Sequence, residues 1–286
     1  MNKEEFIKKI EEYCLNCKAN YVSEEDAIYP SLIDLRMYDL PLIGFASSED
    51  LLFTETFKKE EVIHPLYKAP KEWLDDSKSV ISFFFPISKE IKDSNTKLFD
   101  EPYEEGIEMS CSAQWLLARC EGQLYINEVV SYAASLLNQC GYKTIIPSLS
   151  KDFKMLELFK SNWSERHAAY AAGLGTFGLS RGLITSKGMA GRIGSLITNA
   201  YFKPTTREYT DPFEYCIKCG ACQVRCPGQA IDLSRGIKLG KDQIKCVSHI
   251  SNSTKKPFGI NKRVRYGCGK CQVGLPCSDG IPSKNI

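Results

Sequence analysis

Eight cysteines in the last quarter of the 286-residue chain have the spacing of metal ligands. Four of them form the run Cys216-x2-Cys219-x2-Cys222-x3-Cys226, which Pro227 follows. This run is the bacterial pattern for cubane iron–sulfur clusters. The other four are Cys246, Cys268, Cys271 and Cys277. Because each cubane takes four thiolates, the eight cysteines predict two 4Fe-4S clusters and a role in electron transfer.

The spacing also predicts how the cysteines divide between the clusters. Two-residue gaps let one loop place three sulfurs on one cube, whereas in two-cluster ferredoxins the fourth cysteine of the run binds the other cluster. The first predicted cluster site is Cys216, Cys219, Cys222 and Cys277. The second is Cys226, Cys246, Cys268 and Cys271.

Zinc is the alternative metal for some of these thiolates. The pairs Cys216-x2-Cys219 and Cys268-x2-Cys271 together would satisfy a tetrahedral four-cysteine site. That arrangement leaves the other four cysteines without a ligand role, so the two-cluster interpretation accounts for more of the sequence.

Composition is that of an ordinary globular protein, with 43% hydrophobic and 25% charged residues. Residues 1–10 are charged from the third position and lack the apolar core of a secretory signal. The longest strongly apolar run, residues 80–87, is too short to cross a bilayer. We therefore expect a cytoplasmic protein without a membrane partner, in which cysteines stay reduced.

A local basic stretch accompanies the second set of cysteines, although the net charge of the chain is only +2. Its members are Lys255, Lys256, Lys262, Arg263, Arg265 and Lys270. The stretch is either a solvated loop or a docking surface, and the docking partner would be an acidic electron donor or a nucleic-acid backbone.

The elements that must position these cysteines alternate between helix and strand, which predicts an α+β fold. Apolar spacing indicates helices over residues 4–17 and 112–140, and Ser164 can cap a third over 165–172. Strands are expected at 41–46, 79–86, 142–146, 182–185 and 192–198. The apolar run at 80–85 is typical of a strand covered on both faces.

Composition changes near residues 203–206, where we place a boundary between two domains. Residues 1–205 would form the cofactor and substrate domain, and residues 206–286 the double-cluster domain. The second domain is small and rich in loops, so its clusters should supply much of its folding energy. Cys14, Cys17, Cys111, Cys120 and Cys140 lie outside the cluster pattern and are interpreted as core residues.

Gly173, Gly175 and Gly178 match the pattern GxGxxG. A dinucleotide-binding fingerprint follows a strand and opens a helix, but this segment follows an expected helix and enters a strand. Two interpretations remain. The segment is a helix end with a tight loop, or its backbone closely approaches a large planar cofactor.

Residues 163–178 (WSERHAAYAAGLGTFG) and 195–199 (SLITN), together with the eight cysteines, resemble the epoxyqueuosine reductase superfamily, which is related to reductive dehalogenases. The resemblance implies a nitroreductase-like domain that holds cobalamin and a ferredoxin-like domain that supplies its electrons. By position, Leu183, Ile193 and Leu196 fall near residues that line the corrinoid in that family, beside the glycine segment.

The sequence departs from the family at the proton donor. Epoxyqueuosine reductases carry an Asp shortly before the Ser-x-Arg helix, where this chain has Leu158, Phe159 and Lys160. The remaining candidates for the donor are Tyr170, His167 or another acid in the pocket. The last cysteine motif also differs, because Cys271 and Cys277 are separated by five residues rather than three.

These features predict an iron–sulfur oxidoreductase. Electrons from a reduced ferredoxin or flavodoxin would pass through two 4Fe-4S clusters to cobalamin for a reductive reaction on a small molecule or tRNA. The alternatives are an electron-transfer protein without cobalamin and an epoxyqueuosine reductase that acts on tRNA.

Overall fold

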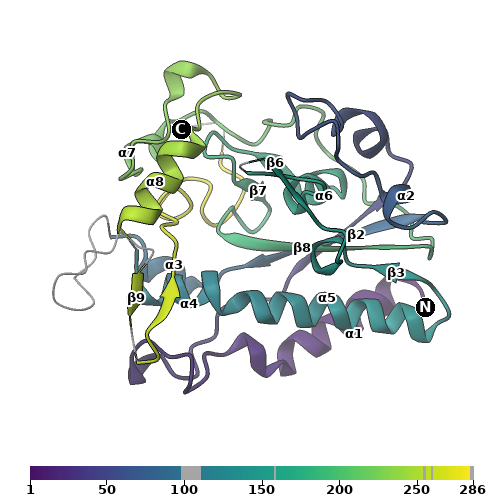
Figure 1. The fold of residues 1–286 in the computed structure, drawn as a ribbon, viewed down its shortest axis with the longest axis horizontal. Coiled ribbons are helices and arrows are strands. Elements are labelled where there is room, and N and C mark those ends of the chain that lie inside the picture. Colours follow the sequence, from purple (N-terminus) through teal and green to yellow (C-terminus); the bar gives the residue numbers. More distant parts are fainter. Residues whose placement is uncertain (98–110, 158, 254–255, 259, 284–286) are drawn as a thin grey trace.

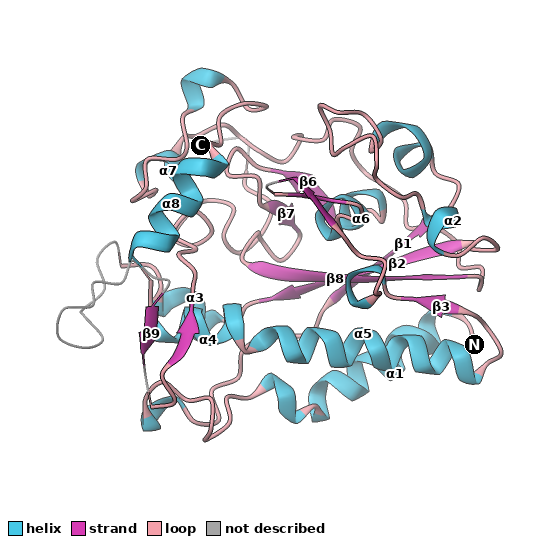
Figure 2. Cartoon of the chain, in the orientation of Figure 1, coloured by secondary structure: helices cyan, strands magenta, loops and turns pink. Residues whose placement is uncertain are grey.

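The computed structural model describes residues 1–97, 111–157, 159–253, 256–258 and 260–283 (Figure 1). A four-stranded antiparallel sheet with the order β1-β2-β8-β3 lies between two helical layers (Figure 2). Helices α1 (Lys3–Asn16) and α5 (Gly122–Gln139) cover one face, and α6 (Glu165–Ala171) packs against the other. This confirms the predicted α+β fold.

Strand β2 (Ser79–Pro86) is buried along its whole length between β1 (Leu42–Ser47) and β8 (Gly191–Thr198). Its alternate side chains serve different cores, as a strand covered on both faces requires. Ile81, Phe83 and Phe85 join the core under α1 and α5, whereas Val80 joins an aromatic core beside α6. The short strand β3 (Thr144–Ile145) completes the sheet against β8.

The helix expected over residues 112–140 is divided in two. Ser112 caps α4 (Ala113–Cys120) by accepting a hydrogen bond from Trp115 N at 3.2 Å, and α5 begins two residues after α4 ends. A Cβ atom at Gly122 would lie 2.5 Å from the Tyr38 ring. Glycine is therefore needed where Tyr38 packs against the junction between the helices.

The glycine segment follows a helix and enters a strand, as the sequence predicts. Gly173 has a φ of +81° and follows the C-cap of α6, and β6 (Gly175–Phe177) pairs with β7 (Leu183–Thr185). The other described elements are α2 (Pro70–Trp73), α3 (Lys89–Ser94), β4 (Met155–Glu157), β5 (Lys160–Ser161), α7 (Ala221–Val224), α8 (Gln243–Ser253), β9 (Lys256–Phe258) and β10 (Arg263–Arg265).

The segment at the expected domain boundary packs on the sheet. Thr205 N donates a hydrogen bond to Phe45 O at 2.8 Å, and Phe45 N donates to Thr205 Oγ1 at 3.0 Å. Residues 206–283 carry the eight cysteines and little regular structure apart from α7, α8 and the β9–β10 hairpin. None of the helices in the described ranges is long and apolar enough to cross a membrane.

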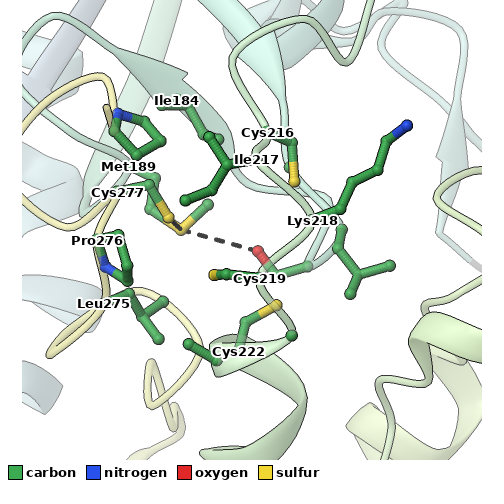
Figure 3. Close-up of a pocket in the computed structure, with 16 residues that line it drawn as sticks. Ile184, Met189, Cys216, Ile217, Lys218, Cys219, Cys222, Leu275, Pro276 and Cys277 are labelled. Atoms are coloured by element: carbon green, nitrogen blue, oxygen red, sulfur yellow. Dashed lines mark hydrogen bonds between the residues drawn. The ribbon is translucent and has the colours of Figure 1, made fainter. Parts of the chain in front are cut away.

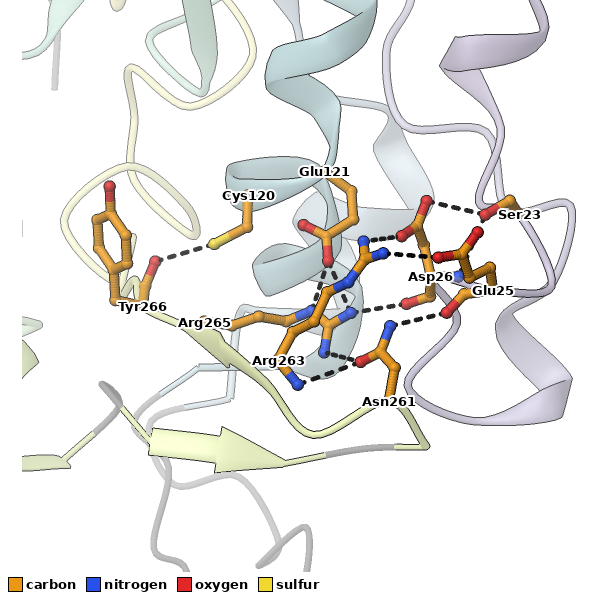
Figure 4. Close-up of polar contacts among 9 residues, drawn as sticks. All are labelled: Ser23, Glu25, Asp26, Cys120, Glu121, Asn261, Arg263, Arg265 and Tyr266. Carbon is orange, nitrogen blue, oxygen red and sulfur yellow. Dashed lines mark hydrogen bonds and ion pairs between the residues drawn. The ribbon is translucent and has the colours of Figure 1, made fainter.

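Several members of the basic stretch make contacts within the molecule, and Figure 4 shows those of Arg263 and Arg265. Arg265 is fully buried and forms an ion pair with Glu121 at 2.6 Å, and Arg263 pairs with Glu25 at 3.0 Å and with Asp26. Lys270 is also fully buried. It donates to the Asn95 side chain at 3.2 Å. Lys255 and the side chain of Lys256 lie outside the described residues. The stretch is thus not the continuous solvent-facing surface that a solvated loop or docking site would require.

Candidate metal centres and cofactor cavity

Cys216, Cys219, Cys222 and Cys277 line one small cavity (Figure 3). A left-handed Gly220, with a φ of +73°, precedes α7 and lets the chain turn between the second and third cysteines. Cys277 arrives from a distant part of the sequence and is fixed by a hydrogen bond from Met189 N to its carbonyl oxygen at 3.0 Å. Ile184, Met189, Leu275 and Pro276 form the apolar wall.

Burial makes two of these thiols, Cys222 and Cys277, poor sites for a free thiolate. Burial raises the pKa of Cys222 to about 11 and that of Cys277 to about 12, and the neighbouring thiols add to both shifts. Without a cation the two thiols therefore stay protonated at neutral pH. Metal ligation replaces the proton and removes this cost of burying a thiolate.

The other four cysteines, Cys226, Cys246, Cys268 and Cys271, line a second and larger cavity. Burial raises the pKa of Cys271 to about 12. Lys241 lies among these cysteines. Burial alone would lower the pKa of Lys241, but Cys271, Cys246 and Cys226 raise it overall. The two groups of cysteines are the same two sets of four that the spacing predicts.

The zinc arrangement is not formed. Cys216 and Cys219 line the first cavity, whereas Cys268 and Cys271 line the second. Four thiolates around one zinc ion lie about 3.8 Å apart, given a Zn–S bond of about 2.3 Å. Among the described residues, no three cysteine sulfurs lie within 4.8 Å of one another. Neither group of described cysteines therefore has the close sulfur spacing of a single zinc ion.

The second cavity has a volume of about 1000 Å³, at the upper end of the range for ligand pockets. Its walls come from α4, α5, β8 and the cysteine-rich segment. Leu183 and Ile193, two of the expected corrinoid contacts, line it together with Phe84 of β2. A large cofactor in this cavity would contact both the sheet and the second group of cysteines.

The other expected cofactor contacts are not among the residues that line this cavity. Leu196 is fully buried in the core under α1 and α5. A Cβ atom at Gly173 would meet Thr205, and one at Gly175 would lie 2.0 Å from Ile184 O. Gly178 lines the first cavity. Gly175 is needed because the backbone of β7 packs directly against it. Gly173 is needed because its left-handed conformation ends α6.

His167 and Tyr170 do not line the large cavity either. Ser164 Oγ and His167 Nδ1 are hydrogen-bonded at 2.8 Å, and burial lowers the pKa of His167 to about 3. The imidazole is therefore neutral at physiological pH, between the rings of Phe57 and Phe177. The Tyr170 ring packs in the same aromatic core, 5.2 Å from Tyr209.

An acid that the sequence reasoning missed, Glu165, lines the large cavity. Ser195 Oγ donates to Glu165 Oε2 at 2.5 Å, and Trp163 Nε1 donates to Ser195 Oγ at 3.0 Å. Burial raises the pKa of Glu165 to about 7, so a substantial fraction carries a proton at neutral pH. In the sequence Glu165 indicated only the first turn of a helix, where acidic residues are common.

No protein-family model and no curated protein sequence matches the chain. Solved structures do match. An epoxyqueuosine reductase from Streptococcus thermophilus has a TM-score of 0.53 and 18% identity, covering 99% of this chain and 68% of its own. An epoxyqueuosine reductase with a modified tRNA stem loop has a TM-score of 0.51 and 16% identity, covering 99% and 68%.

A reductive dehalogenase whose structure suggests a mechanism for B12-dependent dehalogenation has a TM-score of 0.53 and 14% identity. The match covers 84% of this chain and 30% of the dehalogenase. The chain shares the fold of these reductases. The resemblance found in the sequence is therefore confirmed for the fold, which is the level that identities below 20% support.

Proposed function

We propose that this chain is an oxidoreductase that holds two 4Fe-4S clusters and a cobalamin. Electrons from a reduced ferredoxin or flavodoxin would pass through the clusters to the cobalamin for a reductive reaction. The observation that carries this proposal is the shared wall of the large cavity, where four cysteines and the expected corrinoid contacts Leu183 and Ile193 meet.

The residues present fit the proposed groups. Cys216, Cys219, Cys222 and Cys277 would hold the first cluster, and Cys226, Cys246, Cys268 and Cys271 the second. Cys219 is exposed, which favours entry of electrons at the first cluster. The second group opens on the cavity of about 1000 Å³, which has room for a large cofactor. When bound, cobalamin supplies a cobalt centre for bond-breaking reduction.

A two-electron reductive cleavage also consumes a proton, and Glu165 is the acid that this cavity offers. Its raised pKa, to about 7, keeps a proton available near neutral pH, and the hydrogen bond from Ser195 fixes its side chain. We assign the proton-donating role to Glu165 in preference to His167 and Tyr170, because those two side chains pack in the aromatic core.

Anaerobic reconstitution with iron and sulfide tests the proposal. We expect about eight irons per chain and a visible spectrum of cob(II)alamin that changes on mixing with the protein. Far fewer irons, or zinc alone, would overturn the cluster assignment. Eight irons with an unchanged cobalamin spectrum would instead favour the alternative, an electron-transfer protein without cobalamin.

A tRNA substrate is the second candidate for the reaction. It is favoured by the fold match to an epoxyqueuosine reductase bound to a tRNA stem loop. Against it, the stretch 158–160, where the family's acid is expected, contains no acid, and its Phe159 lines the large cavity. Arg263 and Arg265 already pair within the molecule. A salt-sensitive shift of tRNA mobility on adding the holoprotein would support this candidate.

A further inference from the structure

Two arginines line the large cavity on the side nearest Tyr266. Arg119 comes from α4, and its guanidinium lies 4.8 Å from the centre of the Tyr266 ring. Arg192 comes from β8 and donates a hydrogen bond to Gln123 Oε1. Burial lowers the pKa of Arg192, and the positive charge of Arg119 lowers it further. Both cations thus line the same cavity, and Gln123, which accepts the hydrogen bond from Arg192, lies four residues after Arg119 at the junction of α4 and α5.

No carboxylate offsets these positive charges within the described part of the chain. Glu165 is the only acidic residue among the described residues that line the cavity, and its Oε2 accepts from Ser195. Other arginines of the chain have acidic partners: Arg36 pairs with Asp39, and Arg207 with Asp50. Among the described residues, Arg119 instead lies over the ring of Tyr266, and Arg192 instead donates to the side-chain oxygen of Gln123.

A partly buried cation without an anion is costly, and two adjacent ones cost more. An anion between them removes both penalties. Guanidinium groups favour planar or tetrahedral oxyanions, because they donate two parallel hydrogen bonds to a carboxylate or a phosphate. Nearby Lys241 does not need the same anion, since it lies among Cys226, Cys246 and Cys271.

We propose that Arg119 and Arg192 form a binding site for a phosphate or carboxylate group inside the large cavity. The inference deepens the proposed function and rests on it, because the anionic group would belong either to the substrate or to the cofactor. In the first case the enzyme acts on an anionic substrate, and in the second the two arginines anchor the cofactor beside the second group of cysteines.

Titration calorimetry of the anaerobically reconstituted protein with pyrophosphate and, separately, with citrate tests the site at low ionic strength. We expect saturable binding that weakens at least tenfold in Arg119→Gln and in Arg192→Gln. Arg192→Lys should bind more weakly than the unchanged protein, because it keeps the charge but loses the paired donors. Arg36→Gln, which removes an exposed arginine, is the matched control and should bind normally.

Absence of binding to the unchanged protein would overturn the inference, as would an equal loss in Arg36→Gln. Iron content and circular dichroism of each variant check its folding, and two independent arginine variants keep the test valid when one misfolds. Repeating the titration after addition of cob(II)alamin distinguishes the sources. Lost pyrophosphate binding assigns the site to the cofactor, whereas retained binding assigns it to the substrate.

This test is separate from that of the proposed function. A protein that binds eight irons and cob(II)alamin but neither anion refutes the arginine site alone. A protein that binds pyrophosphate through both arginines but leaves the cobalamin spectrum unchanged refutes the cofactor assignment alone.

Discussion

The two groups of cysteines lie in contrasting surroundings. The first group lies in a small pocket with apolar walls of Ile184, Met189 and Leu275. The second shares a wide cavity with Lys241 and the arginines of α4 and β8. Reduction adds negative charge to an iron–sulfur cluster. Nearby cations therefore stabilise the reduced form and raise the reduction potential of the cluster. If both groups hold clusters as proposed, the difference would favour electron transfer from the first cluster to the second.

Removing one ligand from each group gives the largest expected effect. Cys219→Ser and Cys271→Ser should each lose about four of about eight irons, because each cubane takes four thiolates. Iron and sulfide analysis after anaerobic reconstitution measures the loss. In Cys219→Ser the remaining cluster should keep its effect on the cobalamin spectrum under reducing conditions, whereas in Cys271→Ser that effect should disappear. Retention of eight irons by either variant would contradict the division of the cysteines.

Glycines in the loops that carry the two groups of cysteines provide a second contrast. Gly269 has a φ of +69°, and a Cβ atom there would lie 2.0 Å from the Trp115 ring. Gly220 has a similar φ of +73°, but its nearest neighbour would be Leu233 at 3.7 Å. Gly269→Ala should therefore cost about 3 kcal/mol through strain and overpacking, and Gly220→Ala about 1 kcal/mol through strain alone.

The urea midpoint of the holoprotein reports both losses. Similar midpoints for the two glycine variants would show that Trp115 does not pack tightly on the second loop.

Lys241 tests the electrostatic part of the comparison. Lys241→Gln should lower the midpoint potential of the second cluster by on the order of 50 mV, because it removes a buried positive charge beside three ligands. Redox titration followed by electron paramagnetic resonance measures the shift. Lys245→Gln changes an exposed lysine of α8, four residues after Lys241, and should leave both potentials unchanged. An equal shift at the first cluster would contradict a local effect.

The last prediction concerns the pH dependence that Glu165 gives to the stability of the molecule. The pKa of Glu165 rises from 4.5 to about 7 on folding, so the folded state binds more protons between these values. The free energy of unfolding should therefore fall as pH rises from about 4.5 to about 7. Glu165→Gln should reduce this fall in thermal unfolding of the holoprotein, whereas Glu208→Gln, at an exposed position, should not. An unchanged profile in Glu165→Gln would show that this carboxyl does not titrate there.

Local signals were sufficient where neighbours in the sequence determine the structure. The apolar run of β2 and the serine and glycine at the ends of α6 predicted those elements nearly to the residue. Cysteine spacing likewise predicted both groups that line the cavities. These features depend on residue type and short-range spacing, which the sequence states directly.

Contacts between distant residues were not predictable in this way. The gap between α4 and α5 depends on Tyr38, which contacts Gly122 from far earlier in the chain. Burial of Arg265 depends on Glu121, and burial of Lys270 on Asn95. Glu165 was missed for the same reason, since the cavity that it lines is assembled from many separate parts of the sequence. The available signal was a titratable residue at the start of a helix, inside the family motif at residues 163–178.

The pocket of the first cysteine group is built by residues on both sides of the expected domain boundary at residue 205. Ile184 and Met189 supply part of its wall, and a Cβ atom at Gly188 would lie 2.0 Å from Ser278 O. Residues 206–286 are consequently not a portable module. Transplanted to another protein as a miniature ferredoxin, they would lose that wall and leave the bound cluster open to oxygen and water.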